Sequence, residues 1–295
     1  MRKLFFFLVL SNSILFCQTK LPVGDSIQNF LFAQSPNKTP LIITKNGTFE
    51  FLSEWKYSPF SNNSFKEEIE KIDELNHANF FTIIKSNQLY IVSNGAGPVF
   101  IYQNNFFNRI DNSTLHKNQF GGARFVYNNK IHIYGGYGFW SFKNFITFYD
   151  ENINQWDLLY NDSEYMPNGR WKPIYNLIND KLYVLGGRSG LAGSTNQDQS
   201  FSDVFYFDFL TKEFKNIGKL NPKLKTKYSL FAHPKIDNSI ILLNNNFLTK
   251  VDFENKIFTK YSKPKGFSGI DNKYPTYINN KTLYYISDLN DEKFL

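Results

Sequence analysis

A pair of adjacent glycines closes an apolar run at two places in this chain, and the residues behind each pair follow the same order. An aromatic residue followed directly by Asp comes after the glycines, and a second aromatic residue lies seven positions beyond the first. The two copies are Gly135-Gly136 with Tyr149 and Trp156, and Gly186-Gly187 with Phe207 and Phe214. A fixed spacing that recurs along a chain indicates one structural unit used several times.

Weaker copies of the same unit extend the repeat over most of the chain. Asn94-Gly95 and Asn244-Asn245 take the place of the glycine pair, and a half unit ends at Ser287-Asp288. Successive pairs are 41, 51 and 58 residues apart. Such unequal steps indicate a constant core with loops of varying length.

Each unit reads as four short antiparallel strands. A tight polar turn, such as Ser86-Asn87, Asn128-Asn129 or Asn179-Asp180, joins the first strand to the strand that precedes the glycines. Asn and Asp tolerate the left-handed backbone angles that these hairpin turns require. Four-stranded antiparallel units repeated radially form a β-propeller, so the chain is predicted to be an all-β propeller of five or six blades.

The order of apolar strand, double glycine, Tyr and Trp resembles the Kelch repeat. The match is close at Gly135-Gly136, phenylalanines replace Tyr and Trp behind Gly186-Gly187, and residues 40–290 carry the resemblance as a whole. It implies blades in which glycines let a strand end turn at positive φ, while large aromatic side chains fill the wedge between adjacent sheets. A β-sandwich suits the composition, but it would not repeat this order of residues.

Residues 19–295 are expected to form a single propeller domain, because the 18% aromatic and 42% hydrophobic residues are spread evenly. The runs 41–44 and 48–52 look like the third and fourth strands of a unit, which the truncated last unit lacks. We therefore expect an N-terminal hairpin to pair with the C-terminal strands and close the ring without exposed edges. Further strands at 27–33 and 292–295 would raise the number of blades from five to six.

Residues 1–18 are predicted to be a signal peptide. Arg2 and Lys3 precede an apolar core that is too short to span a membrane. The protein is therefore expected to be secreted, periplasmic or at the cell surface. Cys17, the only cysteine, stands where a lipoprotein signal would carry its lipidated residue, although Phe16 departs from the small residue expected before it. Removal with the signal and lipidation are the two alternatives, and a membrane contact is expected only with lipidation.

The sequence shows no catalytic set and no metal-binding set, and no cofactor is predicted. The four histidines are scattered, and His132 lies inside a predicted core strand. Some Kelch-like propellers are copper-radical oxidases that use a cysteine joined to a tyrosine, and a chain without cysteine after Cys17 cannot form that cofactor. The formal charge of +7 is mild, and nucleic acid is not an expected partner.

Loop lengths predict which face of the propeller carries the function. In a four-stranded blade the connections from strand two to strand three, and from one blade to the next, emerge on the same face. These connections are the long ones here, as in residues 137–143 and 188–202. Loop variation on a rigid scaffold is typical of binding surfaces. The candidate ligand contacts on this long-loop face are Tyr137, Trp140, Arg170, Arg188 and Asp198.

These candidates suggest two kinds of contact. The aromatic segment 137–142 presents rings that would stack on a sugar or grip an apolar side chain, unless they pack between blades. Arg170 stands where Kelch repeats often carry an arginine before the first strand, and it either binds an anion or hydrogen-bonds neighbouring loops. Arg188 and Asp198 would join it from the loop 188–202.

Two classes of function follow from this pattern. The first is a monomeric exported interaction module that binds a protein or a glycan through the long-loop face. The second is an enzyme acting on a sugar, resembling periplasmic Kelch-type sialic acid mutarotases, which needs only one or two polar residues in the central pocket. Converging Arg, Glu, Asp or His side chains would favour the enzyme, and an exposed aromatic patch would favour the binding module.

Overall fold

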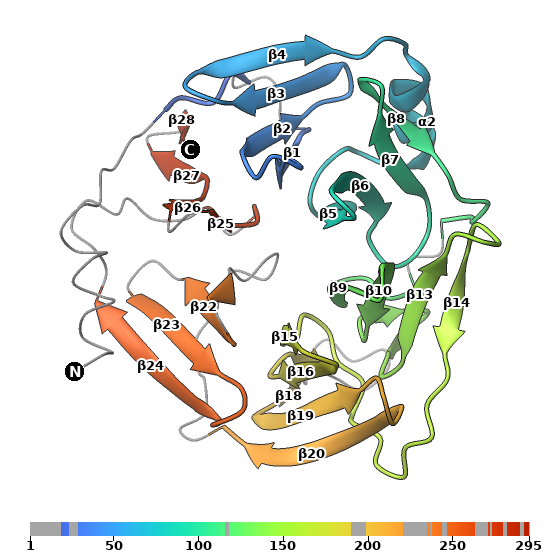
Figure 1. Ribbon diagram of the computed structural model, residues 1–295, viewed down its shortest axis with the longest axis vertical. Helices are drawn as coiled ribbons and strands as arrows, with labels where there is room; N and C mark the ends of the chain where they lie inside the picture. The colour runs from blue at the N-terminus through green and yellow to red at the C-terminus, as the bar shows by residue number, and fades with distance from the viewer. Residues whose placement is uncertain are drawn as a thin grey trace.

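The computed structural model of the chain is a ring of β-sheets (Figure 1). It describes residues 19–23, 29–115, 118–189, 199–220, 235–236, 238–243, 247–262, 271, 273–279, 282–289 and 292–294. Within these residues, five four-stranded antiparallel sheets follow one another around the ring in chain order and form the blades of a β-propeller. The predicted fold class is therefore confirmed.

In the first two blades, consecutive strands pair in sequence, and the first strand lies nearest the ring centre in Figure 1. The first blade contains β1 (Leu31–Gln34), β2 (Pro40–Ile43), β3 (Gly47–Phe51) and β4 (Trp55–Pro59). The second contains β5 (Phe80–Lys85), β6 (Gln88–Ser93), β7 (Val99–Gln103) and β8 (Phe106–Arg109).

The third and fourth blades contain the glycine pairs and have the same order of pairing. The third blade consists of β9 (Ala123–Tyr127), β10 (Lys130–Tyr134), β13 (Ile146–Asp150) and β14 (Gln155–Leu159). The fourth consists of β15 (Ile174–Ile178), β16 (Lys181–Leu185), β19 (Asp203–Asp208) and β20 (Glu213–Lys219). Strands β11, β12, β17 and β18 lie outside these sheets and are described with the candidate site.

The fifth blade is followed by two short hairpins. The blade contains β21 (Lys235–Ile236), β22 (Ser239–Leu243), β23 (Phe247–Asp252) and β24 (Ile257–Ser262). The hairpins are β25 (Tyr277–Asn279) with β26 (Thr282–Tyr284), and β27 (Ser287–Leu289) with β28 (Glu292–Phe294). Both hairpins lie in the sector between the fifth and the first blade in Figure 1.

The polar turns predicted between first and second strands adopt the expected backbone. Ser86, Asn87, Asn128, Asn129 and Asn179 all have positive φ, between 44° and 59°. Type I′ hairpin turns need positive φ at both central residues, and Asn reaches that region at low cost. The sequence therefore located these turns correctly.

The closure of the ring differs from the predicted hairpin pairing. Strand β2 already pairs with β1 on one side and β3 on the other, and β3 pairs with both β2 and β4. These strands have no edge left for the C-terminal strands. The two ends of the chain nevertheless meet through side chains, since the Phe30 and Tyr274 rings stack at 5.0 Å and Tyr277 Oη donates to the Phe32 carbonyl at 3.1 Å.

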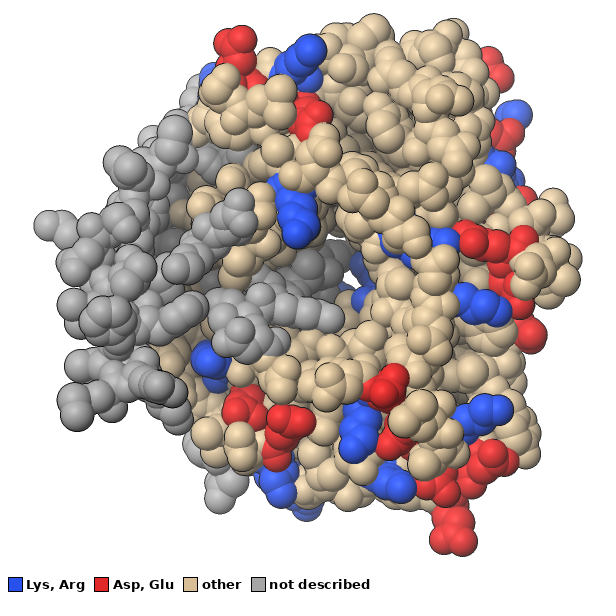
Figure 2. All heavy atoms as spheres, in the orientation of Figure 1, with Lys and Arg blue, Asp and Glu red and all other residues tan. Residues whose placement is uncertain are grey.

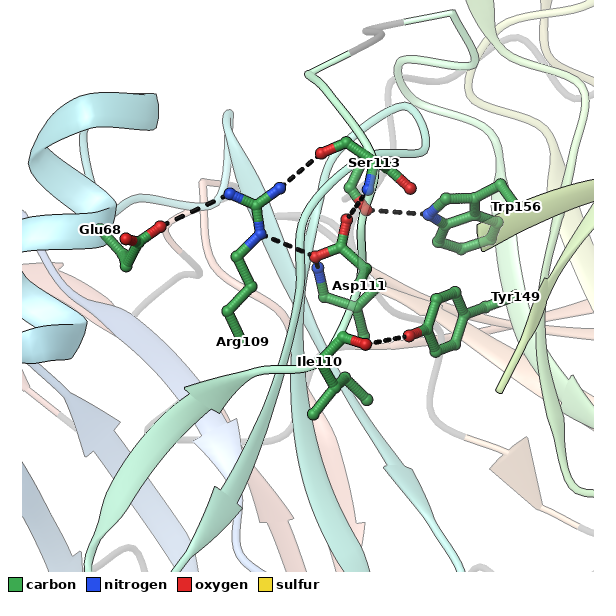
Figure 3. A network of polar contacts seen from close by, with 9 residues as sticks. Glu68, Arg109, Ile110, Asp111, Ser113, Tyr149 and Trp156 are labelled. Carbon is green, nitrogen blue, oxygen red and sulfur yellow. Dashed lines mark hydrogen bonds and ion pairs between the residues drawn. The ribbon is translucent and has the colours of Figure 1, made fainter. Parts of the chain in front are cut away.

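The aromatic pair of the third blade anchors it to the second. Tyr149 Oη donates to the Ile110 carbonyl at 2.8 Å, and Trp156 Nε1 donates to the Gly97 carbonyl at 2.8 Å (Figure 3). Both acceptors belong to the chain before the third blade. The expectation that the repeat aromatics fill the wedge between blades is confirmed, and here they add a hydrogen bond each.

The aromatic pair of the fourth blade fills its wedge by packing alone. The Phe207 and Phe214 rings lie 4.8 Å apart, and both belong to a buried cluster that includes Phe125 and Tyr134 of the third blade. Phenylalanine replaces Tyr and Trp without loss of this packing role, because the cluster is apolar.

The connection that follows β8 is fixed by the Asp111 carboxylate. Asp111 accepts hydrogen bonds from the backbone N–H groups of Val99 at 2.9 Å and Ser113 at 2.8 Å. Arg109 donates to Asp111 through Nε at 2.9 Å, to the Ser113 carbonyl, and to Glu68 at 3.5 Å (Figure 3). This network joins the outer strand of the second blade to the neighbouring helix.

That helix, α2 (Ser64–Ile72), packs against β8 on the outside of the ring. Phe65 and Ile69 on its inner side are buried. Asn63 is the N-cap of this helix, no side chain caps it, and Ser64 Oγ donates to Asn62 Oδ1 at 2.7 Å. Across the described part of the chain, no helix is both long and apolar enough to cross a membrane.

Candidate functional site

Each glycine pair is followed by an extra hairpin that stands outside its blade. Strands β11 (Tyr137–Gly138) and β12 (Ser141–Phe142) follow Gly135-Gly136, and β17 (Arg188–Ser189) and β18 (Gln199–Ser200) follow Gly186-Gly187. Both hairpins lie between the second and third strands of their blades, as the loop lengths predicted. The glycine pairs therefore mark the two blades that carry inserted hairpins.

The two inserted hairpins are anchored in the same way. Phe120, just before the first strand of the third blade, exchanges two backbone hydrogen bonds of 2.9 Å with Tyr137. Trp171, in the matching place of the fourth blade, exchanges bonds of 2.8 and 2.9 Å with Arg188. Each hairpin therefore lies against the segment that enters its own blade from the previous one.

The second glycine of each pair permits this close approach. Gly136 has φ of 97°, and a Cβ there would lie 2.4 Å from the Gln119 carbonyl. Gly187 has φ of 83°, and a Cβ there would lie 3.0 Å from the Trp171 carbonyl oxygen. Only glycine combines this φ with the absence of a side chain.

The tip of the β11–β12 hairpin carries two exposed aromatic rings. Phe139 is 70% exposed and Trp140 is 75% exposed, the latter being the most exposed of the large apolar side chains described. Below them the Tyr137 and Phe142 rings pack at 4.9 Å. We refer to Phe139 and Trp140 as the ring pair.

The backbone of the ring pair is costly for these residue types. Phe139 has φ of 44° and Trp140 has φ of 62°, the positive angles of a two-residue type I′ turn. The same angles occur at Asn104-Asn105 and Asn128-Asn129, where Asn tolerates them. Bulky residues at positive φ are uncommon and store strain, which is often kept at functional sites.

Arg170 is a structural residue in this fold. Its side chain is fully buried, pairs with Asp203 through two hydrogen bonds of 2.9 and 3.2 Å, and donates to the carbonyls of Gly186 and Asn168. Its guanidinium also lies 4.5 Å from the centre of the Phe205 ring. Of the two sequence-based alternatives for Arg170, the structure favours bonding to neighbouring loops.

The remaining predicted contacts are placed as follows. Tyr137 forms the base of the β11–β12 hairpin, half-buried, and Trp140 forms its tip. Arg188 begins β17 and is half-buried on the same face. Asp198 lies outside the described residues.

Sequence reasoning missed two further cations, Arg124 and Lys172, of which Lys172 lies near both Arg188 and Arg124. Arg124 lies on β9, the innermost strand of the third blade, and Lys172 lies just before β15. Arg124 is the only charged residue in β9 (Ala123–Tyr127), and this departure from an apolar strand could have identified it from the sequence. Burial lowers the pKa of Lys172, and the charges of Arg188 and Arg124 lower it further.

A polar cleft of about 420 Å³ lies on the outer rim, away from these hairpins. It is bordered by Ser64, Glu68, Phe107, Asn108, Arg109 and Asp111. Its arginine already bonds both carboxylates and a carbonyl in the network of Figure 3. We therefore regard this cleft as part of the framework that holds the helix.

Comparison with protein families identifies two Kelch motifs in the chain, at residues 118–160 and 176–221. The first segment contains the third blade and the second covers the fourth blade from the middle of β15 onward, and these are the two blades with double glycines and inserted hairpins. A solved structure of YjhT is similar to this chain, with a TM-score of 0.53 and 14% identity over 70% of this chain and 71% of that one. This similarity shows a shared propeller fold. No sequence among the curated proteins matches the chain.

Proposed function

We propose that the protein is an interaction module that binds a partner protein or a glycan through the long-loop face. The observation that carries this proposal is the ring pair, two large aromatic side chains that are exposed although their backbone angles are unfavourable for them. Asn would be the more stable choice at these backbone angles, and the chain uses it in the turn Asn128-Asn129. Selection for a contact surface explains the rings.

The chemistry of the ring pair suits either partner. Phe and Trp offer large rigid faces at low cost in conformational entropy, and such rings contribute strongly to protein interfaces and stack on sugar rings. The tip projects from a short hairpin that is bonded to Phe120 by two backbone hydrogen bonds, so its position is fixed before binding. A fixed contact loses less entropy on association.

The proposal is tested by replacing the ring pair with the residues that the chain itself uses in such turns. We expect the Phe139→Asn/Trp140→Asn variant of residues 19–295 to lose binding in a glycan array or a protein pull-down. Leu210→Ser is the matched control, because Leu210 is 73% exposed in the turn between β19 and β20, on the opposite face. Equal binding by both variants and the unaltered chain would exclude the ring pair.

The alternative is a sugar-acting enzyme that resembles periplasmic Kelch-type sialic acid mutarotases. The observation in its favour is a hydrogen bond of 2.8 Å from Arg124, on the innermost strand of the third blade, to Asn94, which follows β6. Such an enzyme would speed the exchange between the α and β forms of a sugar, which NMR measures directly. Acceleration that survives replacement of the ring pair would favour the enzyme over the binding module.

Export is part of the same proposal. The charged and apolar pattern of residues 1–18 supports a signal peptide, and these residues lie outside the described part of the chain. Mass spectrometry of the protein from an expressing bacterial cell would give the N-terminus of the mature chain. A mature chain that begins after residue 17 supports removal of Cys17, a lipid mass on Cys17 supports anchoring, and an intact Met1 contradicts export.

A further inference from the structure

Arg170 lies between the two inserted hairpins and is bonded to both of the loops that contain them. It directly precedes Trp171, which pairs with the first residue of β17. Basic side chains line part of the central opening in Figure 2, but the side chain of Arg170 is fully buried and is not exposed there. Its contacts with the neighbouring loops therefore decide its role.

The backbone of Arg170 holds both legs of the β11–β12 hairpin at its base. The Gly136 N–H donates to the Arg170 carbonyl at 2.8 Å, and the Arg170 N–H donates to the Lys143 carbonyl at 3.0 Å. Gly136 directly precedes β11, and Lys143 directly follows β12. The packing is close, since a Cβ on Gly169 would lie 2.2 Å from the Phe142 carbonyl oxygen. The base of the hairpin that carries the ring pair is therefore fixed to Arg170.

The side chain of Arg170 holds both legs of the insertion that contains β17 and β18. Its guanidinium donates to the Gly186 carbonyl at 3.1 Å, before β17, and to the Asp203 carboxylate at 2.9 and 3.2 Å, after β18. The guanidinium also lies 4.4 Å from the centre of the Phe201 ring and 4.5 Å from the centre of the Phe205 ring. A planar guanidinium makes these bonds and ring contacts together, which an ammonium group cannot do.

Gln119 occupies the matching place in the third blade, one residue before Phe120. Its side chain is buried and donates to the carbonyls of Ile133 at 3.2 Å and Phe145 at 3.3 Å, one on each leg of the β11–β12 insertion. The two blades therefore share one arrangement, in which a buried polar side chain fastens the insertion of its own blade. Arg170 adds to this the backbone bonds to the hairpin of the preceding blade.

We propose that Arg170 is a positioning residue that sets the orientation of the ring pair by joining the two inserted hairpins into one rigid surface. The contacts run from the Asp203 carboxylate through the guanidinium to the Arg170 backbone, and from there to the base of the β11–β12 hairpin. A contact surface that is rigid before association loses less conformational entropy when a partner binds. The inference rests on the proposed function, because the ring pair is the contact that Arg170 orients.

Hydrogen exchange followed by NMR tests this role in the free protein, with Asp203→Asn as the perturbation. Asparagine keeps the shape of the side chain but loses the charge that holds the guanidinium. We expect the Gly136 amide, which bonds to the Arg170 carbonyl, to exchange about tenfold faster relative to the Ile133 amide of β10. This ratio separates local opening from global unfolding, because global unfolding exposes both amides.

Asp208→Asn is the matched control, because Asp203 and Asp208 are the first and last residues of the same strand, β19. Asp208 lies on the face of the short turns, where its carboxylate lies 4.0 Å from Lys181 Nζ. Because this end of the strand is remote from Arg170, the control should leave the ratio of the Gly136 to the Ile133 exchange rate within about twofold.

The same spectra report on the ring pair through the indole N–H of Trp140. Asp203→Asn should shift or broaden this signal, because the hairpin that presents Trp140 is less firmly held at its base. The Trp156 indole donates to the Gly97 carbonyl between the second and third blades, and its signal should stay in place.

Arg170→Lys is a second test, since it keeps the charge beside Asp203 but loses the planar fork, and it should change the exchange ratio and the Trp140 signal in the same way. Unchanged values in either variant would overturn the proposal, as would an equal rise of the ratio in Asp208→Asn. No partner is present in these measurements. Failure of the proposed function would appear instead as unchanged binding by the Phe139→Asn/Trp140→Asn variant.

Discussion

The Phe139→Asn/Trp140→Asn variant should be more stable than the unaltered protein. Both residues occupy left-handed backbone angles, with φ of 44° and 62°, that cost bulky side chains about 1 kcal/mol or more each. Asn occupies equivalent angles at Asn104-Asn105 and Asn128-Asn129 in this chain. The replacement therefore removes strain and keeps the turn.

The rings give little stability in return for this strain. Phe139 is 70% exposed and Trp140 is 75% exposed, so their removal forfeits only a small part of the apolar burial of an interior ring. The pair Tyr137 and Phe142 below them stays in place. We expect a net gain of about 1–2 kcal/mol in the free energy of unfolding, or roughly 2–6 °C in Tm.

Differential scanning calorimetry and urea titration measure this gain on the folded chain. The reciprocal variant Asn128→Phe/Asn129→Trp, which places the rings in an Asn turn of the opposite face, should lose a similar amount. A fall in Tm for Phe139→Asn/Trp140→Asn would refute the reasoning, because it would show that the rings stabilise the fold.

Three further predictions follow from buried groups. Arg170→Met should lower the free energy of unfolding by about 3–5 kcal/mol in urea titration, because it leaves the Asp203 carboxylate without its partner. Adding Asp203→Asn to this variant should recover part of the loss. A loss below about 1 kcal/mol would contradict the structural role of Arg170. Trp156→Phe should lower the free energy of unfolding by about 1–3 kcal/mol, since a buried carbonyl loses its donor, and a neutral result would contradict that bond. Burial lowers the pKa of His132 to about 4, below the unfolded value of 6.5, so its contribution of about 3 kcal/mol is present above pH 6.5 and is lost as the pH falls toward 4. His132→Phe should therefore flatten the pH dependence of Tm in that range, and an unchanged slope would count against a buried neutral ring.

The parts of the fold that depend on local pattern could be predicted from the sequence. The Asn turns, the strand ends at the glycine pairs and the wedge-filling role of Tyr149 and Trp156 all follow from short-range spacing. The first blade was misassigned because the strand considered at 27–33, which overlaps β1, was not paired with the run 41–44, and β4, which ends in Pro59, was not recognised. Without them, β2 and β3 looked like an unpartnered hairpin.

The candidate site was predictable only in part for a different reason. The segment 137–142 is unusually aromatic for a loop, so its role as a contact surface could be predicted from the sequence. The proximity of Lys172 to Arg188 could not, since it arises only because the inserted hairpin pairs with Trp171. Arg170 was a candidate ligand contact in the sequence, but in the structure its side chain is fully buried and paired with Asp203. The sequence does not show that Asp203 lies beside it.

Hydrogen exchange of the chain with and without its captured partner tests the central claim most directly. The account predicts that binding protects the backbone of residues 137–142 and leaves the Asn turns of the opposite face, such as Asn128-Asn129, unchanged. Protection confined to those turns, with residues 137–142 exchanging as in the free protein, would contradict the assignment of the long-loop face as the binding surface.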